Sequence, residues 1–241
     1  MRVNQKLRCF TAANICSSAS EGVLIKLDDQ LALTPSGKII CLPSLPLASN
    51  IVEELNNQPK ELDFESMPLL KIACTAIDFV AVKRAEVVKK VAKYAETDML
   101  CYRVDPASDL GVSQSKIWQP ILDGLALKFN IIFFVTEDIL PIEQPQSSLL
   151  QIKKLINSLD EHSLAPLLIA TETAGSVIVG LALMFDHISL STAIKASQLD
   201  ETHQEQKWGY DKGLAQSLAK ISRELSIAHQ YISLVNEGIG T

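Results

Sequence analysis

The chain has 241 residues, of which 47% are hydrophobic and 21% charged, and its formal net charge is −6. That length allows one large domain or two modest ones with separate cores. The negative balance excludes a general nucleic-acid binder, which needs a concentrated positive field to displace counterions, so no nucleic-acid partner is expected.

The first part of the chain carries short runs that are typical of strands. Residues 23–28 alternate, with Val23, Ile25 and Leu27 on one face. Two further runs, 31–34 and 38–42, are separated by residues with turn chemistry. Short alternating runs joined by tight turns predict an antiparallel meander.

Helical periodicity begins near residue 46. Leu47, Ile51 and Leu55 recur every four residues, and Ser66 and Pro68 are predicted to cap and open a central, buried helix. The next helical run has a basic face, for which a solvated helix surface is the favoured interpretation and a peripheral membrane surface the alternative. That face consists of Lys83, Arg84, Lys90 and Lys93.

The run Asn130–Val135 fits either a buried strand or the end of a helix, because periodicity alone cannot separate the two. The most apolar stretch is Ser163–Phe185, whose longest uncharged part, Thr173–Phe185, is shorter than the about 20 residues of a membrane span. A buried helical pair is therefore predicted, without membrane insertion. Gly175 and Gly180 lack a following lysine, so they indicate close helix packing and no nucleotide site.

These patterns predict an α+β protein. A small antiparallel β-rich N-terminal domain, residues 1–62, precedes a larger all-helical C-terminal domain, residues 63–241.

The stretch "LDETHQEQKWGYD", residues 199–211, gathers acids, a histidine and a tryptophan. On a helix Glu201, Glu205 and Trp208 share one face, whereas His203 lies about 200° from Glu201. A common metal site is therefore excluded, and no metal or other cofactor is expected. A solvated acidic face and a partner-binding surface stay open as interpretations. Gly209 is predicted to end the helix, with Trp208 packed inward against the C-terminal helix.

The alternative to a binding protein is a small hydrolase or transferase that uses Cys101 or the carboxylates of Glu201 and Glu205. No nucleophile motif supports it, and the five cysteines indicate reduced thiols in a cytosol-like compartment, with Cys74 and Cys101 as small core residues.

Four segments, in order, resemble the ATP synthase assembly chaperones that bind the alpha subunit of the soluble catalytic sector. They are "LPSLPLASNIVEELNNQ", "MPLLKIACTAID", "YAETDMLCYR" with the later "WQPILD", and "GSVIVGLAL" followed by "LDETHQEQKWGYD". The chain departs from the family pattern at Leu55 and at Gly124, where the family usually has aromatic residues, and both departures are interpreted as core variations.

The resemblance implies a non-enzymatic, nucleotide-independent protein that shields the alpha subunit until the beta subunit replaces it. It also implies that the partner-binding residues are Asp200, Glu201, Gln204, Glu205, Trp208 and Asp211. The first strands resemble the start of the family domain by Lys6, so a cytoplasmic bacterial protein is expected, or a mitochondrial matrix protein for a eukaryotic source.

Overall fold

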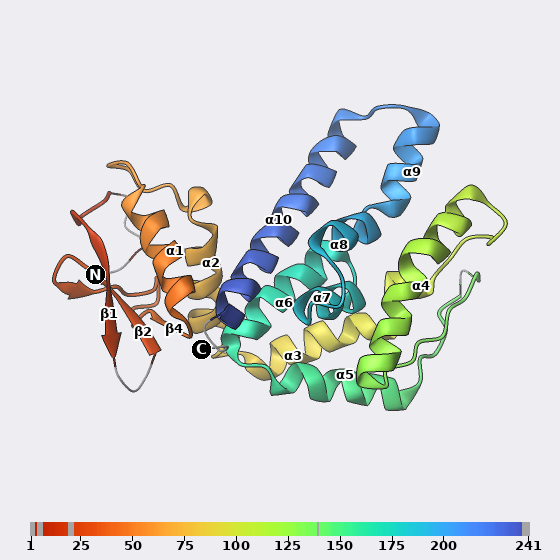
Figure 1. The fold of residues 1–241 in the computed structure, drawn as a ribbon, viewed down its shortest axis with the longest axis horizontal. Coiled ribbons are helices and arrows are strands. Elements are labelled where there is room, and N and C mark those ends of the chain that lie inside the picture. Colours follow the sequence, from red (N-terminus) through yellow and green to blue (C-terminus); the bar gives the residue numbers. More distant parts are fainter. Residues whose placement is uncertain (1–2, 4–6, 19–21, 139, 238–241) are drawn as a thin grey trace. The chain divides into compact units, whose positions relative to one another are not determined.

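A computed structural model describes residues 3, 7–18, 22–138 and 140–237 of the chain, with strands first and helices after them (Figure 1). The predicted α+β class is confirmed, whereas the predicted domain start at Lys6 lies outside the described residues. The strands are β1 (Ala13–Ser18), β2 (Gly22–Leu27), β3 (Gln30–Leu31) and β4 (Cys41–Leu42). The α-helices are α1 (Leu45–Asn56), α2 (Pro68–Thr75), α3 (Arg84–Lys93), α4 (Asp109–Phe129), α5 (Gln146–Ser158), α6 (Glu161–Ala174), α7 (Val177–Met184), α8 (Leu190–Ser197), α9 (Leu199–Trp208) and α10 (Lys212–Glu237).

The chain forms two compact units. The first comprises Met1–Arg84, Leu159–Pro166 and Gln230–Thr241, and the second comprises Ala85–Ser158 and Leu167–His229. Helices α6 and α10 therefore each contribute residues to both units. The domain boundary after residue 62 stays a prediction.

The sheet of the first unit is built around β2, which pairs antiparallel with β1, β3 and β4. Ile25 and Leu27 are buried, as the alternation predicts. Gly37 adopts φ 89° in the turn before β4, a conformation that glycine tolerates without strain.

Helix α1 packs on this sheet through its apolar stripe. Leu47, Ile51 and Leu55 are fully buried, which confirms the four-residue spacing and places the Leu55 departure in the core. Ser44 caps the helix by accepting the N–H of Leu47 at 3.2 Å.

The predicted cap of α2 is wrong. Ser66 lies in a short 3₁₀ turn before the helix, where its hydroxyl bonds the carbonyl of Asp63. The carboxylate of Glu54, on α1, instead accepts the N–H groups of Leu69 and Leu70, both at 2.9 Å. Burial raises the pKa of Glu54. The acceptor comes from a residue distant in sequence, which a local capping pattern cannot reveal.

The core of the second unit contains α7, in which every residue is buried. The carboxylate of Asp98 serves its N-terminal end by accepting the Ser176 hydroxyl at 2.7 Å and the Ile178 N–H at 3.1 Å. Gly180 packs against Thr171, which confirms close helix packing at this glycine. Among the described residues, no helix combines the length and the apolar character that a membrane crossing requires.

Both predicted structures for Asn130–Val135 are wrong. Helix α4 ends at Phe129, because Asn130 adopts a left-handed conformation with φ 54°. The following residues form no regular strand, and Ile132, Phe134 and Val135 are exposed.

Asp98 makes the stability of the protein depend on pH. Burial raises its pKa from 3.8 to about 6, so the folded state binds this proton more tightly than the unfolded chain. The stability contributed by its protonation is fully present below about pH 4 and is lost as the pH rises through about 6. The variant Asp98→Asn lacks this titration. We therefore expect the melting temperature of wild type, relative to that of Asp98→Asn, to be higher at about pH 4.5 than at about pH 7.5.

Calorimetry at both pH values measures this difference, and the exposed Asp29→Asn is the matched control. If the difference in melting temperature between wild type and Asp98→Asn did not change with pH, the raised pKa of Asp98 in the folded state would be contradicted.

Candidate functional site

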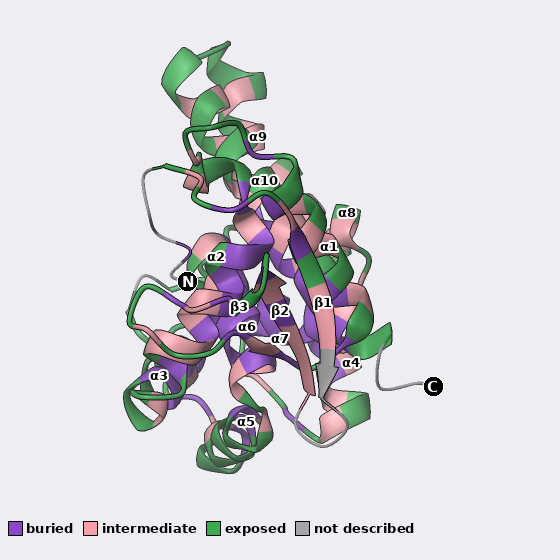
Figure 2. Ribbon diagram, turned by 90° about the vertical axis from the view of Figure 1, so that its left-hand side faces the viewer, coloured by how far each residue is buried: buried purple, intermediate pink, exposed green. Residues whose placement is uncertain are grey.

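The acidic stretch forms α9 and the turn that follows it, in the second unit. Asp200 and Glu201 lie in the first helical turn, where negative charge is favourable. Gly209 ends the helix as predicted, with φ 95°, and its N–H donates to the carbonyl of Glu205 at 2.8 Å. Within α9 no residue is buried, and Figure 2 shows the helix in the colours of exposed and intermediate residues.

Asp200 anchors this helix. Its carboxylate accepts the side-chain amide of Gln114, on α4, at 2.9 Å, and the oxygen of the same buried amide accepts the N–H of Val104 at 3.0 Å. The Trp118 indole N–H also donates, to the carbonyl of Ala196, at 3.0 Å. Asp200 is therefore a structural tie as well as part of the acidic face.

Glu201 and Glu205 are in a different situation. Both are partly exposed, and Gln204 beside them is exposed. Within the part of the chain that the structure describes, the side chains of these three residues make no hydrogen bond or ion pair. Their carboxylates and amide are thus available to a partner.

The predicted burial of Trp208 is wrong. Its exposed fraction is 74%, and the ammonium of Lys207 lies 5.8 Å from the ring centroid. Tyr210, which sequence reasoning missed, is 76% exposed. Gly209 turns the chain between the two rings, and nothing lies within 4 Å of a Cβ placed there. The sequence "WGYD" places Tyr210 directly after the glycine that ends α9, and this position could have indicated a second aromatic residue at the turn.

Asp211 begins α10. Its carboxylate accepts the N–H of Leu214 at 2.7 Å, the geometry of a helix cap. At the other end of α9, the side chain of Gln198 donates to the Leu218 carbonyl at 2.6 Å and ties the start of α9 to α10. Four predicted residues therefore present free side-chain groups here: Glu201, Gln204, Glu205 and Trp208. The carboxylates of the other two are engaged, Asp200 with the side chain of Gln114 and Asp211 with the backbone of Leu214.

The surroundings of Cys101 do not favour the alternative of a hydrolase or transferase that uses this thiol as its nucleophile. Burial, followed by the charge of Asp98, raises the pKa of the Cys101 thiol to about 12, whereas a nucleophilic cysteine needs a lowered one. Burial also raises the pKa of Cys74 to about 12. No group of three or more metal-ligating side chains gathers anywhere in the described ranges.

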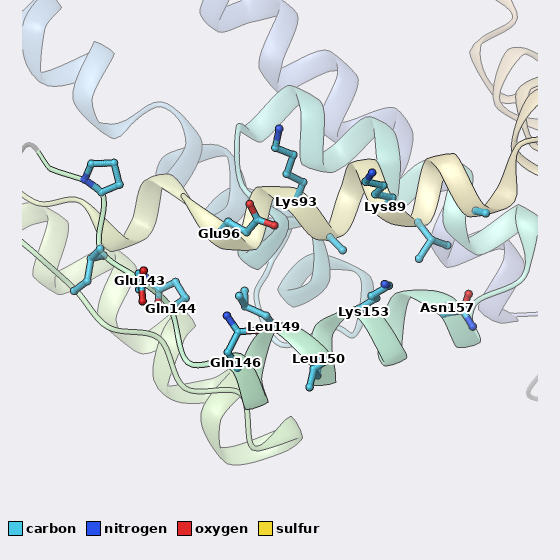
Figure 3. A pocket seen from close by; sticks show the side chains of 15 residues that line it. Lys89, Lys93, Glu96, Glu143, Gln144, Gln146, Leu149, Leu150, Lys153 and Asn157 are labelled. Atoms are coloured by element: carbon cyan, nitrogen blue, oxygen red, sulfur yellow. The ribbon is translucent and has the colours of Figure 1, made fainter.

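A second surface feature is a pocket of about 890 Å³ between α3 and α5. Figure 3 shows Lys89 and Lys93 on one side and Leu149, Leu150 and Lys153 on the other. Lys90, part of the predicted basic face, is exposed and ion-paired with Glu172 on α6. Lys83, Lys90 and Lys93 are exposed and Arg84 is partly exposed, in agreement with the solvated-face interpretation.

Comparison with known proteins identifies the family. The sequence model described as "ATP12 chaperone protein" matches residues 7–126. The crystal structure of Atp12 from Paracoccus denitrificans superposes with a TM-score of 0.91 and 28% identity, over 95% of this chain and 98% of that one. The chain belongs to the ATP12 chaperone family. It is accordingly a chaperone of ATP synthase assembly.

Two further relatives agree with this membership. A putative chaperone from Agrobacterium tumefaciens has a TM-score of 0.88 and 25% identity, over 95% of this chain and 85% of that one. The protein "atp12, mitochondrial" of Schizosaccharomyces pombe is 24% identical over 199 residues, which is 78% of this chain and 68% of the relative. The family model ends at residue 126, so α9 lies beyond it.

The two tryptophans allow a test of whether Trp208 is exposed, because Trp118 is buried. We expect Trp208→Ala to shift the melting temperature by less than about 2 °C, because surface substitutions change stability by roughly 0.5 kcal/mol or less. Trp118→Ala should cost about 3–5 kcal/mol, because that side chain is buried and hydrogen-bonded.

Thermal unfolding of both variants checks this, and iodide quenching of the remaining tryptophan reports its exposure. If Trp208→Ala were as destabilising as Trp118→Ala, the exposed position of Trp208 would be refuted.

Proposed function

We propose that this chaperone binds the alpha subunit of the catalytic sector of ATP synthase through α9 and the turn after it. It shields the subunit interface of alpha until the beta subunit takes its place. The alpha subunit is the client that the sequence resemblance implies, and the proposed contact residues are Asp200, Glu201, Gln204, Glu205, Trp208 and Asp211.

One observation carries the proposal: two uncompensated carboxylates lie beside two exposed aromatic rings at a helix end. Large aromatic side chains are favoured anchors of protein interfaces, and the surrounding polar groups select the partner by charge. Glu201 and Glu205 supply the charge, and Trp208 and Tyr210 supply the apolar area. A client surface that fits carries arginine or lysine side chains around an apolar patch.

Binding of this kind needs neither turnover nor nucleotide. The high pKa of the Cys101 thiol supports a non-enzymatic role, as does the membership of a chaperone family. Independence from nucleotide and metal, and a location in the bacterial cytoplasm or the mitochondrial matrix, stay predictions.

Charge reversal on α9 tests the proposal. We expect Glu201→Lys and Glu205→Lys each to weaken binding of isolated alpha subunit about tenfold or more, because a lysine there repels the basic client groups that the carboxylate would pair with. Glu201→Lys should lower stability by about 1 kcal/mol or less, because it removes a favourable negative charge from the first helical turn. Glu205→Lys should leave stability unchanged, since that side chain is neither buried nor bonded within the described residues. Biolayer interferometry gives the affinity and circular dichroism the fold.

Glu53→Lys is the matched control, because it changes the net charge equally at an exposed position on α1. Equal weakening by all three variants would mean that only overall charge matters. Unchanged affinity in both α9 variants, with the fold intact, would remove α9 from the interface.

A further inference from the structure

The residues after α4 form an extended segment, here called the open edge, that comprises Ile132–Thr136. Its backbone is held on one side only. The N–H and C=O of Ile132 both bond the hydroxyl of Ser148, at 2.9 and 2.7 Å. The N–H and C=O of Phe134 both bond the side-chain amide of Gln144, at 2.9 and 3.0 Å.

Thr136 continues the same pattern with a backbone partner. Its N–H donates to the carbonyl of Cys101 at 2.8 Å, and its C=O accepts the N–H of Arg103 at 2.9 Å. Every second residue thus directs both of its polar groups to the same side. A two-residue period is the signature of a β-strand, in which alternate residues face opposite neighbours.

The intervening residues, Phe133 and Val135, must then direct their polar groups to the other side. In the described ranges of the chain, neither their N–H nor their C=O groups have a partner. Two N–H and two C=O groups in strand register are therefore open. The side chains of Ser148 and Gln144 on the closed side stand in for a neighbouring strand.

The open edge is also apolar. The exposed fractions are 53% for Ile132, 51% for Phe134 and 37% for Val135. A long, exposed, hydrophobic edge is a template for pairing with another chain, and proteins normally protect it with charge or proline. No charge or proline lies within Ile132–Thr136.

The charged side chains on the same stretch of chain are of one sign. Residues 129–152 contain three acidic residues, Glu137, Asp138 and Glu143, and no basic residue. A complementary strand therefore alternates apolar side chains and carries lysine or arginine near the end that meets Glu137 and Asp138.

We propose that the open edge binds an extended segment of a partner polypeptide by β-strand addition. The partner's backbone bonds the N–H and C=O groups of Phe133 and Val135, its alternate apolar side chains cover the exposed side chains, and its basic end meets the acids. Main-chain hydrogen bonds provide affinity in this mode and alternate side chains provide specificity. The proposal does not depend on the identity of the client or on α9.

A designed peptide serves as the probe. It has the sequence acetyl-Lys-Val-Thr-Val-Thr-Val-Lys-amide, with a basic residue at both ends so that either strand direction is served. Amide hydrogen exchange by NMR is measured with and without the peptide, and fluorescence anisotropy gives its affinity. We expect the amides of Phe133 and Val135 to exchange fast in the free protein and at least tenfold more slowly with the peptide bound, while those of Ile132, Phe134 and Thr136 are protected in both states.

Val135→Pro is the decisive variant. It removes an outward N–H that has no internal partner, so the closed side is untouched, and we expect affinity to fall about fivefold or more. Val135→Thr is the matched control, because it keeps the N–H and the branched shape, and it should bind within about twofold of wild type. A peptide with N-methylated central residues should not bind.

Three outcomes would overturn the proposal. One is equal binding of the normal and N-methylated peptides, which would leave side-chain contact alone. Another is strong protection of Phe133 and Val135 in the dilute, monomeric protein, because the edge would then be occupied by the chain itself. The third is protection that appears only with dimer formation in sedimentation, which would identify a second copy as the occupant. The exchange pattern of wild type decides the matter even if Val135→Pro fails to fold.

Discussion

A backbone N–H or C=O that is withdrawn from water needs a partner, and in the second unit side chains supply that partner at several points where the chain enters or leaves a helix. Asp98 serves the start of α7, and Gln114 serves Val104 and Asp200 together. Gln144 and Ser148 serve Phe134 and Ile132. Each such residue fixes the path of a loop without an additional strand or helix, because one side chain satisfies several polar groups.

This constraint explains how α9 is held although it buries nothing of its own. The amide of Gln114 is fully buried and satisfied at both ends, so it can hold Asp200 in one position. With the N-terminal turn fixed in this way and Asp211 capping α10, the residues between them need no internal contacts. Glu201, Glu205, Trp208 and Tyr210 lie in that interval, which leaves them available to a partner.

The sequence predicts best what depends on local periodicity. The alternation of Ile25 and Leu27 and the spacing of Leu47, Ile51 and Leu55 both report burial correctly, and Gly209 ends α9 as expected. The failures depend on distant residues. Glu54 caps α2 from another helix. Trp208 stays exposed because α9 meets α10 through Gln198 at its first turn, and no local pattern encodes where two helices of a hairpin make contact.

The candidate contacts also bear on how an assembly chaperone releases its client. An interface that buries a closed apolar core gains affinity with area and dissociates slowly, whereas carboxylates at a rim act mainly on association and selectivity. Glu201 and Glu205 are already partly hydrated in the free protein, so their desolvation cost offsets part of what they gain on pairing. A surface of free carboxylates around two aromatic rings therefore favours moderate affinity. Moderate affinity allows a permanent subunit to displace the chaperone from its client. The permanent subunit then competes through its concentration and through a larger interface.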